Sequence, residues 1–272
     1  MIEPKNLFTR ITIALLGIPA VIGLIFLGGI YLTIFLIVVS SIALWELFDL
    51  LNNKGLPPGR YTTILAGIIL LLTAGLNPDM IKYAVPLITV MLLLTILIGD
   101  IRNSVRNIAS SIFSTVYIPL NLSFILLLRQ IEPAGFHLTL IMIVTVWVCD
   151  TFAYSFGSWL GRRPLAPKIS PNKSITGGIA GFAGSLLTVY IFYVFKFIPV
   201  DISLIKILGL GALIGIFTQI GDLIESVIKR DMEVKDSGSI LLGHGGVLDR
   251  FDSIIIVSPV VYFYTIFVLS NL

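Results

Sequence analysis

The hydrophobic residues of this chain stand in long unbroken runs, and polar residues gather between the runs. From Ile11 to Trp45 there are 35 residues without a charge. A bilayer core takes about 20 residues of α-helix, so this run is long enough for two crossings, and Gly28 and Gly29 predict the turn between them. The runs are continuous rather than alternating and far longer than a barrel strand. The pattern therefore predicts membrane-spanning helices.

The remaining runs extend this pattern to the end of the chain. They predict an all-α, polytopic integral membrane helical bundle of about nine transmembrane helices. The first run follows Lys5 and Arg10 and is too long for the apolar region of a signal peptide, so we expect an uncleaved first helix. The expected helices cover residues 11–28, 30–51, 61–77, 81–99, 108–128, 138–159, 178–198, 203–223 and 251–270.

Lysine and arginine divide unequally between the two sides of this topology. With the N-terminus in the cytoplasm, 14 of the 18 fall on the cytoplasmic side. The other four are Lys82, Arg129, Lys196 and Lys206. Positive residues accumulate in cytoplasmic loops, so the distribution supports nine helices with the N-terminus inside and the C-terminus outside.

Composition narrows the class of protein. Charged residues make up 12% of the 272 residues and hydrophobic residues 57%, and the mean hydropathy is +1.03. Soluble domains carry about 25% charged residues, so a soluble enzyme, a disordered chain and a collagen-like rod are excluded. Cys149 is the only cysteine, which excludes a disulfide scaffold. The net charge of +3 is too small to argue for a nucleic-acid partner.

The polar residues divide the chain into two regions. We expect residues 1–135 to form a scaffold of N-terminal transmembrane helices. We expect residues 136–272 to be the catalytic region, because two longer polar loops, 160–177 and 225–250, both fall on the predicted cytoplasmic side.

The first six expected helices contain three carboxylates. Asp150 is inside the sixth expected helix, where a carboxylate is costly unless it faces a polar cavity or a cation. We interpret it as a site residue; the alternative is an Asp hydrogen-bonded to a neighbouring helix. Glu46 and Asp49 lie near the cytoplasmic end of the second expected helix, where we expect them to be solvated at the interface.

A polar stripe emerges from the eighth expected helix. Asp222, Glu225, Ser226 and Lys229 are spaced i, i+3, i+4 and i+7, which places them on one helical face. Such a stripe is either a solvated helix end or the lining of an active cavity. The segment that follows favours the cavity.

That segment, Lys235–Asp252, combines glycines with ionisable residues. His244–Gly246 offers backbone that can approach a phosphate closely. Asp249 and Asp252 are three residues apart at the start of the last expected helix and can point into one space, with Arg250 alongside. Converging carboxylates suit Mg²⁺, and basic side chains suit the charge of a polyphosphate.

The other polar loop, Gly161–Gly178, contains four basic residues, three prolines and no acid. A topology anchor is one interpretation. The run Lys173–Gly178, which leads into a helix, also resembles an anion site at a helix N-terminus. Together the two loops predict a cavity, open to the cytoplasm, for metal-assisted phosphoryl or nucleotidyl transfer to a lipid phosphate. Covalent catalysis fits less well, and an Asp nucleophile stays open.

The segment Ser226–Asp252 resembles the signature of the phosphatidate cytidylyltransferases, or CDP-diacylglycerol synthases. That signature is a Ser, a Lys-Arg pair, a Lys-Asp pair, His-Gly-Gly and Asp-Arg-x-Asp at fixed spacing. The matching residues are Ser226, Lys229, Arg230, Lys235, Asp236, His244, Gly245, Gly246, Asp249, Arg250 and Asp252. Leu242 departs from the family, which usually has Pro there.

A second stretch is also similar to this family. It runs from Asp150–Tyr154 through the basic loop to Gly178. The family usually has a Glu where this chain has Thr176, so we give Thr176 no metal or base role.

The resemblance implies a reaction and its partners. CMP would be transferred from CTP to phosphatidate, a membrane lipid, to give CDP-diacylglycerol and pyrophosphate in phospholipid biosynthesis. The cofactor would be Mg²⁺, and whether a second cation binds stays open. Acyl-chain preference and the choice between CTP and dCTP also stay open.

The implied roles follow the motifs. The expected metal ligands are Asp222, Asp249, Asp252 and, on the opposite wall, Asp150. The expected catalytic residues are Asp222, Asp249, Asp252, Lys229 and Arg250. The residues expected to bind substrate are Ser170, Lys173, Ser174, Ser226, Arg230, Lys235, Asp236, His244, Gly245 and Gly246.

Two other functions stay open. They are a membrane transporter of an anionic solute and another CTP-dependent lipid phosphotransferase. A homodimer is compatible with a bundle of this size, although no interface is identified. The compact chain suggests a bacterial inner membrane, with the active site facing the cytoplasm.

Overall fold

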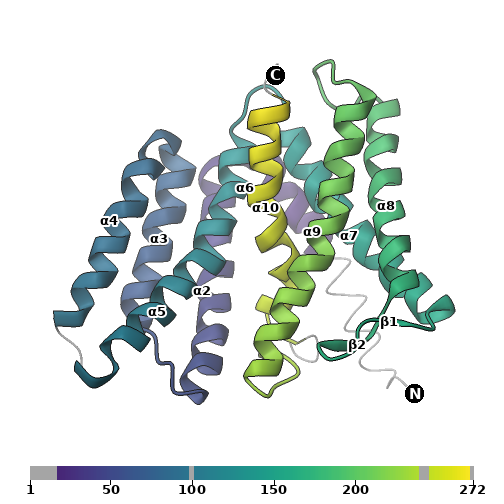
Figure 1. Ribbon diagram of the computed structural model, residues 1–272. Coiled ribbons are helices and arrows are strands. Elements are labelled where there is room, and N and C mark those ends of the chain that lie inside the picture. Colours follow the sequence, from purple (N-terminus) through teal and green to yellow (C-terminus); the bar gives the residue numbers. More distant parts are fainter. Residues whose placement is uncertain (1–16, 98–100, 239–244, 270–272) are drawn as a thin grey trace.

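The computed structural model describes residues 17–97, 101–238 and 245–269, which form an almost wholly helical bundle (Figure 1). A short helix, Gly17–Leu27, precedes the labelled elements. In chain order these are α2 (Gly29–Asn53), α3 (Arg60–Leu76), η1 (Pro78–Met80), α4 (Ile81–Leu94), η2 (Thr95–Leu97), η3 (Ile101–Asn103), α5 (Ser104–Thr115), η4 (Val116–Leu120), α6 (Asn121–Arg129), α7 (Gly135–Leu160), β1 (Pro164–Ala166), β2 (Ser170–Ser174), α8 (Ile175–Val194), α9 (Leu204–Asp231) and α10 (Leu248–Val268).

Seven helical segments in the described part of the chain are long and apolar enough to cross a membrane. They are Gly29–Asn53, Pro78–Leu97, Ile101–Arg129, Gly135–Leu160, Ile175–Val194, Leu204–Asp231 and Leu248–Val268. The helix Gly17–Leu27 and α3 are apolar but shorter. The chain is therefore an integral membrane protein, and the all-α prediction is confirmed. The count of nine spans stays a prediction.

The expected turn at Gly28 and Gly29 is confirmed. Both residues have positive φ angles, 60° and 46°, which glycine adopts without steric cost. Arg129 closes the turn, because its guanidinium donates to the carbonyl oxygens of Ile25 at 2.8 Å and Phe26 at 3.2 Å. These bonds satisfy carbonyls that the end of the preceding helix leaves without intrahelical partners.

Two helix boundaries near the polar loops differ from the prediction. α9 continues to Asp231 instead of ending at 223, and α10 begins at Leu248, so the predicted loop 225–250 shortens to residues 232–247. Helical spacing of the polar stripe allows the helix to continue, and Lys229 and Arg230 in its last turn interact favourably with the helix dipole. Polar residues here mark the end of the apolar run and not the end of the helix.

The loop 160–177 contains a β-hairpin that the sequence pattern does not predict. β1 pairs antiparallel with β2, with Pro164 opposite Ser174 and Ala166 opposite Ser170. The strands have only three and five residues, too few for an alternating pattern to stand out. The hairpin gives the proline-rich loop a defined shape beside α7 and α8 (Figure 1).

One hydrophobic core joins the predicted scaffold to the predicted catalytic region. It contains Phe48 of α2, Leu122 of α6, Met142 of α7 and Ile255 of α10, all buried. α10 packs against α6, α9 and α2, so the division near residue 135 is crossed by continuous packing. A shift of α2 would therefore change its packing against α10.

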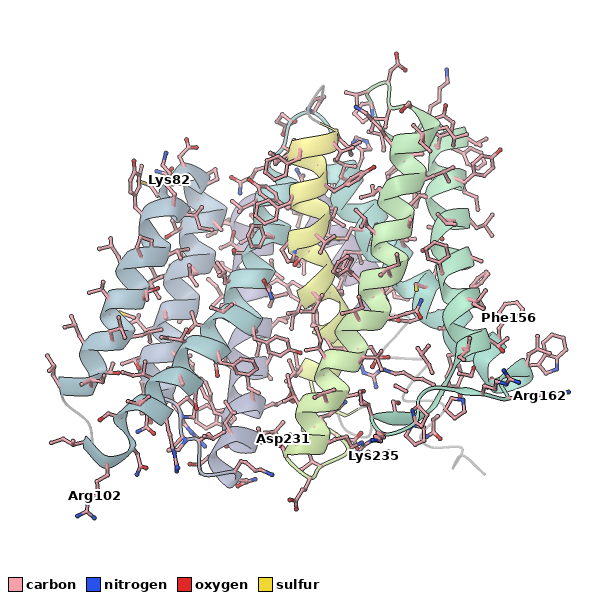
Figure 2. The ribbon with its side chains drawn as sticks, viewed as in Figure 1. Lys82, Arg102, Phe156, Arg162, Asp231 and Lys235 are labelled. Atoms are coloured by element: carbon pink, nitrogen blue, oxygen red, sulfur yellow. The ribbon has the colours of Figure 1, made fainter. Side chains whose placement is uncertain are left out.

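Basic residues that are expected on opposite sides of the membrane lie at opposite ends of the bundle. Figure 2 shows Arg102, Arg162 and Lys235 near one end and Lys82 at the opposite end. The first three belong to the set expected inside and Lys82 to the set expected outside. The hairpin lies at the same end as the first set (Figure 1).

Candidate active site

A polar cavity of about 670 Å³ lies between α7, the hairpin, α8, α9 and the start of α10. It brings together eight of the predicted site residues: Asp150, Ser170, Lys173, Ser174, Asp222, Asp249, Arg250 and Asp252. These come from four elements, α7, β2, α9 and α10, that are far apart in the sequence. Residues of both polar loops therefore line one cavity, as expected from the sequence.

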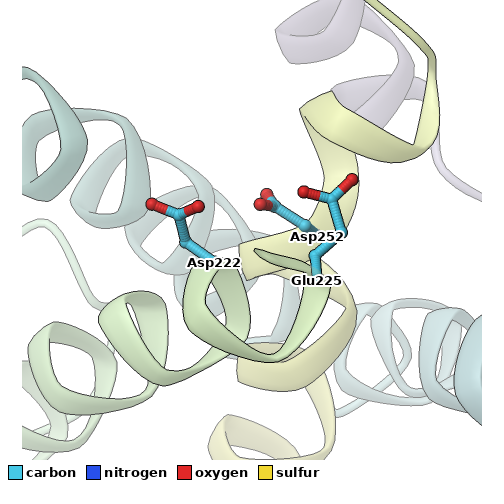
Figure 3. A group of neighbouring side chains, drawn as sticks. All are labelled: Asp222, Glu225 and Asp252. Carbon is cyan, nitrogen blue, oxygen red and sulfur yellow. The ribbon is translucent and has the colours of Figure 1, made fainter. Parts of the chain in front are cut away.

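Three carboxylates converge in this region from α9 and α10 (Figure 3). Asp222, Glu225 and Asp252 each place one oxygen within 4.8 Å of the others. Glu225 and Asp252 are buried, and Asp222 is half-buried. Oε1 of Glu225 is buried and has no hydrogen-bond partner among the described residues. Like charges at this separation repel one another, so the arrangement favours a cation among the oxygens.

Basic side chains neutralise only part of this charge. Nζ of Lys173 lies 2.6 Å from Oδ2 of Asp222. Nζ of Lys229 lies 2.7 Å from Oε2 of Glu225 and 2.6 Å from Oδ1 of Asp249. Among the described residues in and beside the cavity, five carboxylates face three cationic side chains, which leaves two negative charges when all are ionised. The carboxylates are Asp150, Asp222, Glu225, Asp249 and Asp252, and the cations are Lys173, Lys229 and Arg250.

Asp249 is the most heavily hydrogen-bonded of these carboxylates. Besides the Lys229 contact, its Oδ2 accepts from the backbone N–H of Gly246 at 2.7 Å and of Ser237 at 3.1 Å. Asp249 thus links α9, the start of α10 and the segment between them. These three donors occupy most of its acceptor capacity, since an ionised carboxylate offers about four lone-pair sites.

Asp150 lines the cavity from α7 and is accessible to solvent there. This placement agrees with its interpretation as a site residue. It is not among the three carboxylates whose oxygens lie within 4.8 Å of one another.

The N-terminus of α8 opens at the cavity, as the basic loop predicts. Gly177 and Gly178 of its first turn line the cavity. Ser174 is the N-cap, and its hydroxyl accepts from the backbone N–H of Gly177 at 3.1 Å. Free N–H groups at a helix start attract anions.

Several residues expected to bind substrate do not line the cavity. Ser226 is buried, and the guanidinium of Arg230 donates to the backbone carbonyls of Ile169 and Val234. Lys235 and Asp236 are exposed at the end of the bundle. Gly245 and Gly246 lie beside Asp249 and are also outside the lining. His244 lies outside the described residues.

The expectation that Glu46 is solvated is wrong. It is only 3% exposed, and its carboxylate accepts hydrogen bonds from residues at the start of α10. Asp49 is exposed as expected and pairs with Arg60 at 2.7 Å. The signal that was available is that Glu46 is the first charge after a 35-residue apolar run. Sequence spacing also placed Glu225 on the polar stripe without including it in the ligand set.

Comparison with known proteins connects this site to a family. The model of the cytidylyltransferase family matches residues 8–268, nearly the whole chain. The chain belongs to this family. This member of the family is a helical membrane protein with a carboxylate-rich cavity at one end of the bundle.

Individual relatives carry a more specific name. A protein of Synechocystis sp. is 32% identical, with 97% of this chain and 98% of the relative aligned. A protein of Bacillus subtilis is 34% identical over the same shares. A protein of Staphylococcus saprophyticus is 33% identical, with 92% and 95% aligned. All three are named phosphatidate cytidylyltransferase.

Proposed function

We propose that this chain transfers CMP from CTP to phosphatidate, giving CDP-diacylglycerol and pyrophosphate. The observation that carries the proposal is the convergence of Asp222, Glu225 and Asp252 at the cavity wall, with Lys173 and Lys229 beside them. Family membership and relatives named phosphatidate cytidylyltransferase support the same reaction. They also favour it over a transporter or another CTP-dependent lipid phosphotransferase.

The residues present fit a divalent cation, which we propose to be Mg²⁺. Carboxylate oxygens are its preferred protein ligands, and Oε1 of Glu225 is buried with no other partner among the described residues. Asp222, Glu225 and Asp252 would hold the ion. Asp249 would join them by exchanging its Lys229 contact, and Asp150 would act from the opposite wall. A second cation stays a prediction.

When bound, the ion supplies positive charge that stabilises the oxygens of the triphosphate. Lys173, Lys229 and Arg250 add fixed positive charge around the same oxygens. The N-terminus of α8, with Gly177 and Gly178 at the cavity, would receive a phosphate group of CTP or of the lipid. We retain Ser170, Ser226, Arg230, Lys235, Asp236, His244, Gly245 and Gly246 as proposed contacts of the larger substrates.

These residues orient a direct displacement. A phosphate oxygen of phosphatidate forms a bond to the α-phosphorus of CTP, and the bond from that phosphorus to the bridging oxygen of the β-phosphate breaks. Pyrophosphate leaves with the electron pair. No general base is needed, because a phosphate monoester with a second pKa near 6 is mostly ionised at pH 7.

We also propose the orientation in the membrane. The bundle would cross nine times, with the N-terminus and the cavity on the cytoplasmic side of a bacterial inner membrane. Separation of Arg102, Arg162 and Lys235 from Lys82 supports this sidedness (Figure 2). CTP would then enter from the cytoplasm and phosphatidate from the leaflet. A homodimer stays a prediction without an assigned interface.

The test is turnover by the purified chain in detergent. Phosphatidate, CTP labelled at the α-phosphate and Mg²⁺ are supplied, and label in a lipid-soluble product is measured together with pyrophosphate. We expect both products in equal amounts, and neither after chelation by EDTA. Pyrophosphate without labelled lipid would show a different acceptor. No consumption of CTP by folded protein would overturn the proposal.

A further inference from the structure

Glu46 contacts the catalytic region although it belongs to α2, in the region expected to be scaffold. Its Oε1 accepts from the backbone N–H of Val247 at 2.9 Å. Its Oε2 accepts from the backbone N–H of Leu248 at 2.9 Å and from the hydroxyl of Ser237 at 3.2 Å. Burying a carboxylate is costly unless it is hydrogen-bonded, and here three donors and the positive end of α10 surround it.

These contacts come from both sides of the connection between α9 and α10. Ser237 follows α9, whereas Val247 is the N-cap of α10 and Leu248 its first residue. One side chain from α2 therefore holds both sides of the connection together. The sequence separation of about 200 residues means that only the folded bundle makes this contact.

Two glycines make room for the Glu46 carboxylate. A Cβ atom at Gly238 would lie 2.6 Å from Oε1 of Glu46. A Cβ atom at Gly246 would collide with both Oε2 of Glu46 and the Ser237 hydroxyl. The close packing of Gly246 thus has a structural cause besides the approach of a nucleotide.

Glu46 and Asp249 share the donors at the start of α10. The backbone N–H of Gly246 donates to Asp249, and those of the next two residues donate to Glu46. Ser237 contributes its N–H to Asp249 and its hydroxyl to Glu46. The first turn and a half of α10 carries both Asp249 and Asp252, so whatever holds this turn also places those carboxylates.

We infer that Glu46 is a positioning residue for the transferase reaction, holding the start of α10 so that Asp249 and Asp252 keep their places at the cavity. Glu46 itself is not among the cavity-lining residues, so it acts through α10 and not on the substrate. The inferred effect on turnover rests on the proposed function. The anchoring of α10 does not.

The test compares Glu46→Gln with Asp49→Asn in the purified full-length chain. Gln keeps the size of Glu but turns an NH₂ group toward a backbone N–H. We expect kcat to fall about 10- to 100-fold, the range for losing hydrogen bonds to a charged acceptor, with little change in KM for CTP. We also expect faster hydrogen–deuterium exchange of peptides covering residues 245–249.

Asp49→Asn is the matched control. It removes a carboxylate three residues along the same helix, where Asp49 is exposed and pairs only with Arg60 among the described contacts. We expect its turnover and its exchange at residues 245–249 to match the unmodified chain.

A second variant covers the case in which Glu46→Gln does not fold. Ser237→Ala removes only the hydroxyl contact and keeps the backbone N–H donated to Asp249. We expect a smaller fall in kcat, about 3- to 10-fold, and a smaller increase in exchange over the same peptides.

Three results would overturn the inference. They are unchanged exchange in folded Glu46→Gln, faster exchange with full kcat, and, if Glu46→Gln does not fold, unchanged kcat in Ser237→Ala. A different result would count against the proposed function alone: no transfer by the unmodified chain, while Glu46→Gln still speeds exchange at the start of α10. The two failures are therefore distinguishable.

Discussion

The scaffold helices and the cavity satisfy their polar groups in different ways. In the scaffold, Thr33, Ser114 and Thr115 are buried, and each donates its hydroxyl to the carbonyl four residues earlier in the same helix. These bonds form whenever the helix forms, whatever its neighbours are. They make the scaffold polar groups inexpensive to bury and give them no part in chemistry.

Around the cavity, the partners come from different elements. Lys173 of β2 pairs with Asp222 of α9, and Lys229 of α9 pairs with Asp249 of α10. Such pairs exist only when the bundle is complete, so their stability and their chemistry are coupled. Glu46 departs from the scaffold pattern, because its partners lie on the other side of the boundary at residue 135. The comparison teaches that a buried carboxylate bonded across elements is the better guide to function.

The largest effect should come from removing the lysine ammonium group that Glu225 and Asp249 share. Lys229→Met leaves Glu225 and Asp249 facing each other without Nζ, and Glu225 is only 2% exposed at its side chain. Breaking a buried pair in this way costs about 3–5 kcal/mol. Thermal unfolding in detergent should show a lower Tm. Adding Glu225→Gln should recover part of the loss, and strictly additive losses would contradict the coupling.

The next largest effect should fall on turnover. Asp222→Asn and Asp252→Asn each remove a charge from the carboxylate cluster, and we expect kcat to fall about 10²- to 10³-fold, as when a preorganised electrostatic group is lost. Mg²⁺ titration of the residual activity should show a higher half-saturating concentration. Full Mg²⁺-dependent activity in Asp252→Asn, with normal unfolding, would remove Asp252 from the proposed ligands. The same measurement on Asp249→Asn tests whether Asp249 exchanges Lys229 for the ion.

A smaller effect is expected from Gly246→Ala. The added methyl group collides with Glu46 and Ser237, and overpacking of this kind costs about 1–3 kcal/mol. Gly23→Ala is the control, because a Cβ atom there has no atom within 4 Å beyond the adjacent residues and the backbone of its own helix. Equal stability and turnover of the two variants would show that Gly246 is not packed against Glu46 as described.

The smallest effect should come from a scaffold hydroxyl. Thr115→Val keeps the shape of a buried side chain and removes only its bond to the carbonyl of Ser111. Hydrogen bonds between side chains and helices in membranes contribute about 0.6 kcal/mol, so we expect a small change in Tm and unchanged turnover. A large loss of turnover would contradict the conclusion that hydrogen bonds within the scaffold helices take no part in the reaction.

Local patterns in the chain predicted the class of fold and several of the residues that line the cavity. Each apolar run must satisfy its backbone hydrogen bonds internally within lipid, which makes helices the outcome for any neighbour arrangement. Gly28 and Gly29 marked a turn, because their positive φ angles are a local property. Helical spacing also placed Asp222, Glu225 and Lys229 on one face.

Which of these faces meet depends on how the helices pack. Spacing tells on which side of a helix a residue lies but not which helix packs there, so Glu225 beside Asp252 and Glu46 beside Leu248 could not be read from the chain. The hairpin likewise depends on its position beside α7 and α8, since its strands are too short for a pattern of their own. The position of Glu46 in the sequence predicts a residue at the membrane interface, but the packing of α2 against α10 buries it.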